Sequence, residues 1–166
     1  QDAQFLFAQS GSTLTHVMGI NIYDPATAPG GKVRLRDIIE HVRSRLHTSP
    51  VFQRKLYRLP MDFDFPYWVE DQQFDLESHI SHARLPAPGD WRQFCIQVAR
   101  HFSRPMDMSR PLWDIYVLEG LDNIPGAALG SYAILTRIHH AAIDGASGAY
   151  IFVALSDLDA KGTPAL

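Results

Sequence analysis

Hydrophobic residues gather along the chain in runs that have the length and character of β-strands. Residues 14–23, 112–118 and 131–138 form such runs, and loop-forming residues lie between them. The run 131–138 is almost continuously hydrophobic, which predicts a strand that is buried on both faces. The segment 63–69 is rich in aromatic residues and is broken by Pro66, so we expect a loop that leads into a short strand.

Apolar residues that recur every three or four positions predict a first long helix over residues 35–46. Its inward positions are Leu35, Ile38, Ile39, Val42 and Leu46, with charged residues on the other faces. The Pro/Gly-rich segment 24–32 predicts a loop before this helix, and Pro50 ends the helical region. A short helix is also predicted over residues 1–9.

A second long helix is predicted to begin after the rigid turn 85–89. Asp90 is a good N-cap residue, and Gln93 stands at the capping-box position. We expect the inward stripe of this helix to contain Trp91, Phe94, Cys95, Val98 and Phe102. A third helix over residues 146–158 would pack through Ile151, Ala154, Leu155 and Leu158. Strands and helices mixed in this order predict an α/β fold with helices layered on a mixed sheet.

Length and composition narrow the class of protein. The 166 residues suffice for one domain or for half of a larger enzyme, and 46% hydrophobic with 20% charged residues is typical of a folded protein. A net charge of −3 gives no basic surface for nucleic acid, so we expect no nucleic-acid partner. The single cysteine, Cys95, cannot form an internal disulfide and fits a reducing cytoplasm.

The ends of the chain suggest a piece of a longer protein. The first residue is Gln1, and residues 161–166 have the composition of a linker. We therefore expect one domain over residues 1–160, with 161–166 as the start of a linker to a further domain. No apolar run reaches the ~18–20 residues of a membrane-spanning helix, and no signal peptide is recognisable.

The most informative segment is residues 139–145, where two histidines close a strand and an Asp-Gly pair precedes a helix. Side chains alternate along a strand, so one of His139 and His140 should face a substrate cleft while the other packs inward. Unperturbed histidine titrates near pH 6.5, which suits a general base that activates a hydroxyl. Asp144 can orient the imidazole, pair with an arginine or cap the next helix, and Gly145 permits a tight turn.

Other interpretations of this segment remain open. The two histidines can be purely structural. Ser147 can donate a hydrogen bond in the site or only begin the helix. A metal site is not expected, because adjacent residues chelate poorly and no HExxH or CxxC spacing is present.

The pattern HHxxxDG at residues 139–145 resembles the signature of the coenzyme A-dependent acyltransferases. That superfamily includes chloramphenicol acetyltransferase, carnitine acyltransferases, peptide-synthetase condensation domains and the wax ester synthase/diacylglycerol acyltransferases. The sequence Pro-Leu-Trp-Asp at residues 111–114 looks like the PLW motif of the last of these families in bacteria. Residues 2–7, 16–19, 74–80 and 85–89 are also similar to that family, so the resemblance covers nearly the whole chain.

The resemblance implies a chloramphenicol-acetyltransferase-like two-layer sandwich that is one half of a two-domain enzyme, with the active site in a tunnel between the halves. By position, the family's catalytic base falls on His140, with His139 in support, Asp144 holding the loop and Gly145 permitting the turn. Pro111, Leu112 and Trp113 would be scaffold near the cleft. The C-terminal domain is absent from these residues, so it would be deleted or present as a separate chain.

The resemblance also implies a reaction. A long-chain acyl group would pass from acyl-CoA to a fatty alcohol or diacylglycerol, which gives wax esters or triacylglycerol, and acyl-CoA is a substrate rather than a cofactor. Such an enzyme would work in the cytoplasm, peripherally on the inner membrane or on lipid droplets. The basic residues of the segment 34–58 would contact headgroups or phosphates, or simply be solvated, and the aromatic run 63–68 would line an acyl channel or the core.

Two alternatives compete with this interpretation. A condensation-type acyltransferase of the same superfamily would use carrier-bound substrates, and the PLWD context argues against it. A noncatalytic acyl-CoA- or lipid-binding half-domain would keep the histidines for structure. In either case, this chain on its own would be an inactive half that exposes the apolar face covered by the missing domain, and it would be prone to dimerise.

Overall fold

The main sheet of the computed structural model has four strands, in the order β1-β6-β5-β4. The structure describes residues 14–59, 66–143, 153–157 and 162–163. The strands are β1 (His16–Tyr23), β4 (Ile80–Arg84), β5 (Trp113–Glu119) and β6 (Tyr132–His139). β6 pairs antiparallel with β1 and with β5, whereas β4 and β5 are parallel. The sheet is therefore mixed, and the predicted α/β class is confirmed.

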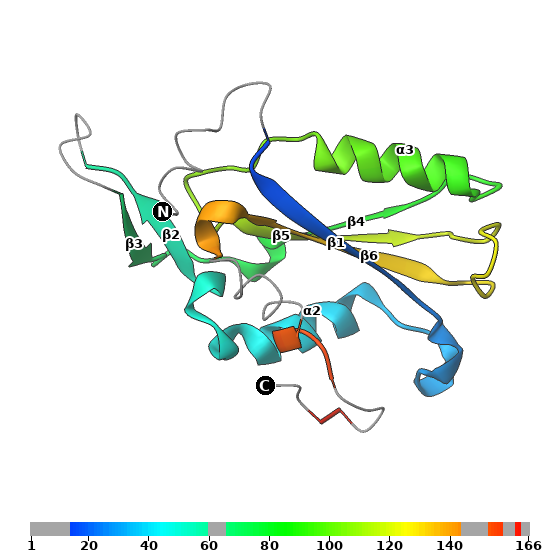
Figure 1. Cartoon of the computed structure of the whole chain (residues 1–166). Coiled ribbons are helices and arrows are strands. Elements are labelled where there is room, and N and C mark those ends of the chain that lie inside the picture. Colours follow the sequence, from blue (N-terminus) through cyan, green and yellow to red (C-terminus); the bar gives the residue numbers. More distant parts are fainter. Residues whose placement is uncertain (1–13, 60–65, 144–152, 158–161, 164–166) are drawn as a thin grey trace.

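A second, two-stranded sheet is formed by β2 (Arg54–Tyr57) and β3 (Tyr67–Glu70), which pair antiparallel. It projects beyond one end of the main sheet (Figure 1). β3 is the short strand expected near residues 63–69, but β2 and β4 were not predicted. Both are short, five residues or fewer, and carry charged residues, so they lack the long apolar runs that marked the other strands.

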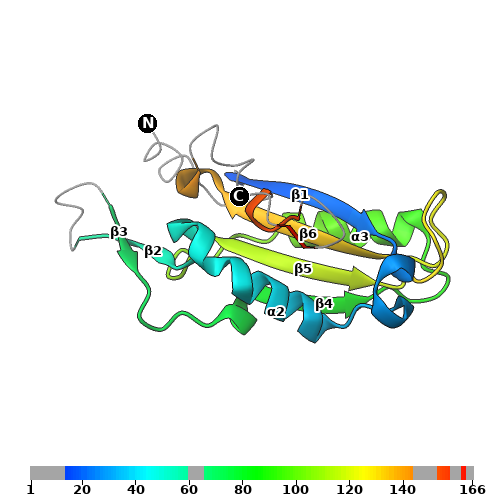
Figure 2. The same ribbon diagram turned by 90° about the horizontal axis from the view of Figure 1, so that it is seen from below.

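The two long helices cover opposite faces of the main sheet. They are α2 (Leu35–Arg45) and α3 (Trp91–Phe102), and Figures 1 and 2 show one on each side. β6 contributes to both cores: Ile138 belongs to the cluster with α2, and Leu135 belongs to the cluster with α3. The predicted burial of this strand on both faces is confirmed. In the described part of the chain, one long helix thus packs on each face of the mixed sheet.

The start of α3 follows the predicted capping box. The backbone N–H of Gln93 donates to Oδ1 of Asp90 (2.8 Å), and the backbone N–H of Asp90 donates to Oε1 of Gln93 (3.1 Å). The predicted inward stripe is partly wrong, because Cys95 is exposed and Trp91 is 53% exposed. Phe94, which is 2% exposed, sets the buried face, and Cys95 lies about 100° further round the helix.

Short 3-10 turns occupy several connections. They are η1 (Pro25–Thr27), η2 (Pro29–Gly31), η3 (Leu46–Thr48), η4 (Pro50–Phe52), η6 (Leu76–His79) and η7 (His140–Ala142). η1 and η2 lie within the predicted Pro/Gly loop. The helix expected over residues 1–9 and most of that expected over 146–158 lie outside the described residues. Within the described ranges, no helix has the length and apolar character needed to cross a membrane.

Candidate active site

The two histidines of the motif lie at the end of β6, where both neighbouring strands hold the backbone. The N–H of His139 donates to the carbonyl of Leu112 (3.0 Å), directly before β5. The N–H of His140 donates to the carbonyl of Thr15 (2.8 Å), directly before β1. Because β6 lies between these strands in the sheet, the backbone of the pair is fixed from both sides.

His139 is completely buried, with 0% of its surface exposed, which confirms that one histidine packs inward. The N–H of Ala141 donates to its Nδ1 (3.0 Å), so Nδ1 carries no proton. The proton of the neutral ring is therefore on Nε2, which donates to Oγ1 of Thr15 (2.7 Å). Burial, followed by the nearby His16 and His140, lowers the pKa of His139 to about 4. His139 is consequently a neutral hydrogen-bonding residue at pH 7.

His140 begins η7 and is partly exposed. Its carbonyl accepts the N–H of Ile143 (3.2 Å), which closes the turn. Ala141 in the same turn is buried with Leu56 of β2 and is packed against Met108. The small second sheet therefore supports the turn that carries His140. Asp144, Gly145 and Ser147 lie outside the described residues.

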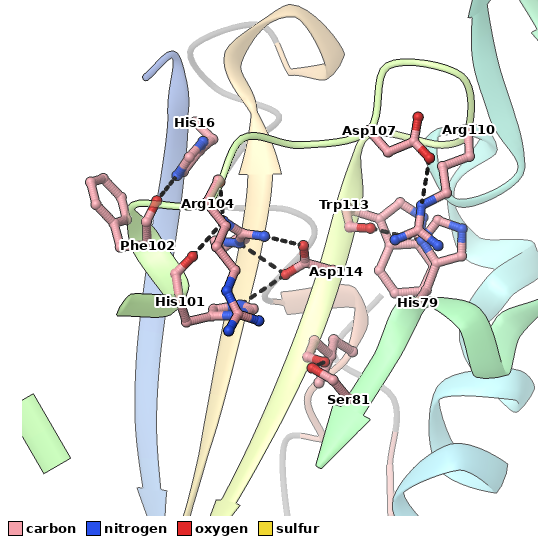
Figure 3. A network of polar contacts seen from close by, with 12 residues as sticks. His16, His79, Ser81, His101, Phe102, Arg104, Asp107, Arg110, Trp113 and Asp114 are labelled. Atoms are coloured by element: carbon pink, nitrogen blue, oxygen red, sulfur yellow. Dashed lines mark hydrogen bonds and ion pairs between the residues drawn. The ribbon is translucent and has the colours of Figure 1, made fainter. Parts of the chain in front are cut away.

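The PLW residues form a buried scaffold directly before and at the start of β5. Pro111, Leu112 and Trp113 are all fully buried. The indole N–H of Trp113 donates to the carbonyl of Phe52 (3.0 Å). The ring of His79 stacks on Trp113 with 4.5 Å between centroids, and its Nδ1–H donates to the Trp113 carbonyl (2.7 Å; Figure 3). Leu112 thus connects a rigid aromatic cluster to the backbone of His139.

A buried charged cluster two residues before His139 was missed from the sequence. Arg137 in β6 and Asp114 in β5 are cross-strand partners. The guanidinium donates to both carboxylate oxygens, through Nε (3.0 Å) and Nη2 (2.5 Å). Nη1 donates to the carbonyls of His101 and Arg104, both at 2.7 Å. We call Arg137, Asp114 and His101 the charged cluster.

His101 completes the charged cluster from the last turn of α3. Its Nε2–H donates to Oδ1 of Asp114 (3.0 Å), and Figure 3 shows the two side chains facing each other. Burial by itself raises the pKa of Asp114, but hydrogen bonds from His101 and Arg137 and the charge of Arg137 bring it down to about 2. A lone arginine in an otherwise apolar strand, and an aspartate directly after Trp113, were the sequence signals for this cluster.

His16 lies beside His139, because the two residues are partners in the β1–β6 register. Its Nε2–H donates to the carbonyl of Phe102 at the end of α3 (2.8 Å; Figure 3). Burial lowers its pKa. Together with the charged cluster, this bond ties the end of α3 to the two strands that carry the histidine motif.

Three cavities lined by described residues lie toward the other end of the main sheet. The largest, about 530 Å³, is lined among others by Lys32, Arg84 and Tyr132, and His140 lines none of the three. Among the described residues, no group of three or more histidine, cysteine or acidic side chains could hold a metal ion. The chemistry that this arrangement offers is a partly exposed imidazole on a rigid turn.

Comparison with known protein families shows which family the chain belongs to. The family described as the wax ester synthase/diacylglycerol acyltransferase catalytic domain matches residues 1–165. The chain belongs to this family. Two Mycobacterium tuberculosis proteins named for diacylglycerol O-acyltransferase activity are similar to it. One is 38% identical over 146 residues, 87% of this chain and 29% of that protein, and the other is 31% identical over 159 residues, 95% and 30%. The chain therefore spans about 30% of the length of these relatives.

Solved structures of the family and of its neighbours have the same fold. A wax ester synthase/diacylglycerol acyltransferase from Marinobacter aquaeolei VT8 matches with a TM-score of 0.70 and 27% identity, over 92% of this chain and 36% of that one. The starter condensation domain of rhizomide synthetase matches with a TM-score of 0.62 at 15% identity, over 92% and 34%. The latter likeness is one of fold alone.

Proposed function

We propose that the protein containing this chain transfers a long-chain acyl group from acyl-CoA to the hydroxyl of a fatty alcohol or diacylglycerol. The products are a wax ester or a triacylglycerol, together with free coenzyme A. One observation carries the proposal: in a chain of this family, His140 stands partly exposed on a turn whose backbone is hydrogen-bonded to both neighbouring strands.

His140 acts as the general base in this mechanism. Its neutral imidazole accepts the proton of the acceptor hydroxyl while that oxygen bonds to the thioester carbonyl carbon. The carbon–sulfur bond then breaks, and the imidazolium returns the proton to the departing thiolate. General-base action of this kind contributes about 10²–10⁴-fold in rate, and alignment of the two substrates supplies more.

The geometry of His139 supports assigning the base to its neighbour. Nε2 of His139 holds the ring proton and Nδ1 accepts from the N–H of Ala141, so the ring has no basic nitrogen turned to a substrate. We assign His139, Asp144, Gly145 and Ser147 supporting roles. Pro111, Leu112 and Trp113 are scaffold.

The choice of substrates rests on the relatives. Their names specify diacylglycerol O-acyltransferase activity, the family name adds wax ester synthesis, and the related condensation domain was solved with C8-CoA bound. We propose that residues 1–160 form the N-terminal domain and that a C-terminal domain, joined through 161–166 or held as a separate chain, completes the substrate tunnel. Water-insoluble acceptors place the reaction at the surface of the inner membrane or of lipid droplets.

Replacement of His140 by alanine in the full-length form that the gene encodes tests the proposal. We expect alcohol-dependent release of thiol from palmitoyl-CoA to fall about 10²–10⁴-fold, while binding of palmitoyl-CoA persists. Hexadecanol and diacylglycerol are compared as acceptors. His82→Ala is the matched control, since His82 lies in β4 at the other edge of the sheet and contacts Glu119 (3.2 Å).

Two results would contradict the proposal. Undiminished thiol release by His140→Ala would remove His140 as the base. Binding of palmitoyl-CoA by the wild type, without thiol release to either acceptor, would favour the noncatalytic acyl-CoA-binding interpretation. Turnover only with carrier-bound acyl groups would instead indicate a condensation-type enzyme.

A further inference from the structure

Thr15 contacts both histidines of the motif through two different atoms. Its carbonyl accepts the backbone N–H of His140 (2.8 Å), and its Oγ1 accepts the Nε2–H of His139 (2.7 Å). The residue lies 124 positions before His139 in the chain and directly precedes β1. Thr15 is itself buried, with 7% of its surface exposed. A single residue from a distant segment therefore holds the backbone of one histidine and the ring of the other.

The N–H of Ala141 and the hydroxyl of Thr15 together select the protonated nitrogen of His139, because the N–H can only donate to Nδ1 and the hydroxyl accepts from Nε2–H. A neutral imidazole has one donor and one acceptor nitrogen, so a hydrogen bond from Nε2–H to Oγ1 leaves Nδ1 as the acceptor. Nδ1 then accepts the N–H of Ala141 (3.0 Å), the residue directly after His140. In the other tautomer Nδ1 would carry a proton directed at the N–H of Ala141, and this bond would be lost.

We infer that Thr15 is a positioning residue for His140, acting through the ring of His139 and the first turn of η7. This inference rests on the proposed function, because it assigns the orientation of the general base in that reaction. The Thr15 hydroxyl accepts the Nε2–H of His139, Nδ1 of His139 accepts the N–H of Ala141, and the Thr15 carbonyl accepts the N–H of His140. The peptide units on both sides of His140 are fixed as a result.

The same arrangement keeps positive charge away from His140. His139 is fully buried, and burial lowers its pKa to about 4, so it stays neutral while His140 takes up a proton. A second imidazolium one residue away would oppose that protonation. The burial of this ring thus keeps positive charge away from the base, while the contact with Thr15 fixes the direction of the base.

The test compares Thr15→Val with Thr15→Ser in the full-length protein. Valine keeps the β-branched shape and the backbone carbonyl but removes the hydroxyl, whereas serine keeps the hydroxyl. We expect kcat for acyl transfer to fall about tenfold to a hundredfold in Thr15→Val with little change in KM, and serine to restore most of it. Thr136→Val is the control, since Thr136 is another buried threonine of the same sheet, four residues before His140.

A spectroscopic measurement reports the geometry independently of turnover. The nitrogen-15 chemical shifts of the His139 ring distinguish the two neutral tautomers, and His139→Gln assigns the signals. We expect the Nε2–H tautomer near pH 7 in the wild type and in Thr15→Ser, and a mixed or reversed population in Thr15→Val.

The outcomes separate this inference from the proposed function. An Nδ1–H tautomer in the wild type would overturn the inference without any variant, so it stays testable if Thr15→Val does not fold. Equal kcat in Thr15→Val and wild type, or equal losses with valine and serine, would also overturn it. A wild type without acyl transfer would contradict the proposed function, while the tautomers would still decide whether the hydroxyl holds His139.

Discussion

Two buried polar side chains, Arg137 and His139, lie two residues apart on β6, and the cost of their burial is offset in opposite ways. At Arg137 the strand buries a full charge, with 4% of the side chain exposed, and meets it with Asp114 and two carbonyls. At His139 the strand buries an imidazole in its neutral form, with each ring nitrogen hydrogen-bonded. Charge is matched at the first position and excluded at the second. The position nearer the proposed reaction is the one kept neutral.

The difference follows from what surrounds each residue. The last turn of α3 and the segment directly after it offer carbonyl oxygens to Arg137, and β5 offers a carboxylate. His139 has a hydroxyl and a backbone N–H as partners. The nearby imidazoles of His16 and His140 oppose the protonation of His139. A buried ion is tolerated only where partners of opposite charge and further hydrogen bonds are present.

Breaking the charged cluster should have the largest effect on stability. Asp114→Ala leaves the Arg137 charge buried without its carboxylate, and we expect a loss of about 3–5 kcal/mol in the free energy of unfolding. Urea denaturation measures it. The double variant Asp114→Leu with Arg137→Met removes both charges and should cost less than Asp114→Ala alone. Equal or additive losses would show that the two side chains do not compensate each other.

The neutral site should respond to pH rather than to a lost partner. The unfolded chain protonates His139 near pH 6.5, but the folded protein does so only near pH 4. The unfolded state therefore binds more protons between these values, and stability falls as the pH falls through this window. We expect a loss of about 3 kcal/mol from this group, from the difference of about 2.5 pKa units. Burial lowers the pKa of His16 and of His79 too, and both add in the same direction.

Denaturation at about pH 7.5 and about pH 4.5 measures this effect, and His139→Gln should flatten it. The charged cluster behaves differently in that range. The folded pKa of Asp114 is about 2 and its usual value is 3.8, so the stability it contributes is present above pH 3.8 and is lost only below it. A loss of stability that began near pH 4, with none between 6.5 and 4, would contradict the neutral state of His139.

The smallest effect on stability should come from the N-cap residue of α3, Asp90. Asp90→Ala removes the cap that accepts the N–H of Gln93, and we expect a loss of about 1 kcal/mol. This variant should leave the pH dependence and acyl transfer unchanged, because the cap lies at the opposite end of α3 from His101. Thermal unfolding and the thiol assay measure both. A change in turnover would show that the loss of the cap at the start of α3 affects the candidate active site.

The elements that the sequence predicted well are those with local signals. The capping box of α3 needs only the spacing of Asp90 and Gln93, and the burial of β6 follows from its continuous hydrophobic run. The alternation of strand side chains predicted that one histidine packs inward, though not which one. The prediction for Cys95 was wrong because α3 carries apolar residues on several sides. Packing against the sheet, which the helix sequence does not specify, decides which side is buried.

The contacts that define the candidate site have no local signal. Thr15 is far from His139 in the chain, and a threonine before a strand is unremarkable in a sequence. Arg137 and Asp114 come together only through the β5–β6 register. Resemblance to a family assigned the roles of His140 and His139, but the residues that hold them in place depend on which strands become neighbours.

The pairing of β1 with β6 has a consequence for the order of events in folding. β1 is the first and β6 the last strand along the described chain, so their pairing closes a loop of more than a hundred residues. Closure of such long loops is slow relative to local structure. α2, α3 and the β2–β3 pair depend on nearer contacts and can form earlier. The hydrogen bonds of Thr15 arise only when that loop closes, so the histidine turn is completed at a late folding step.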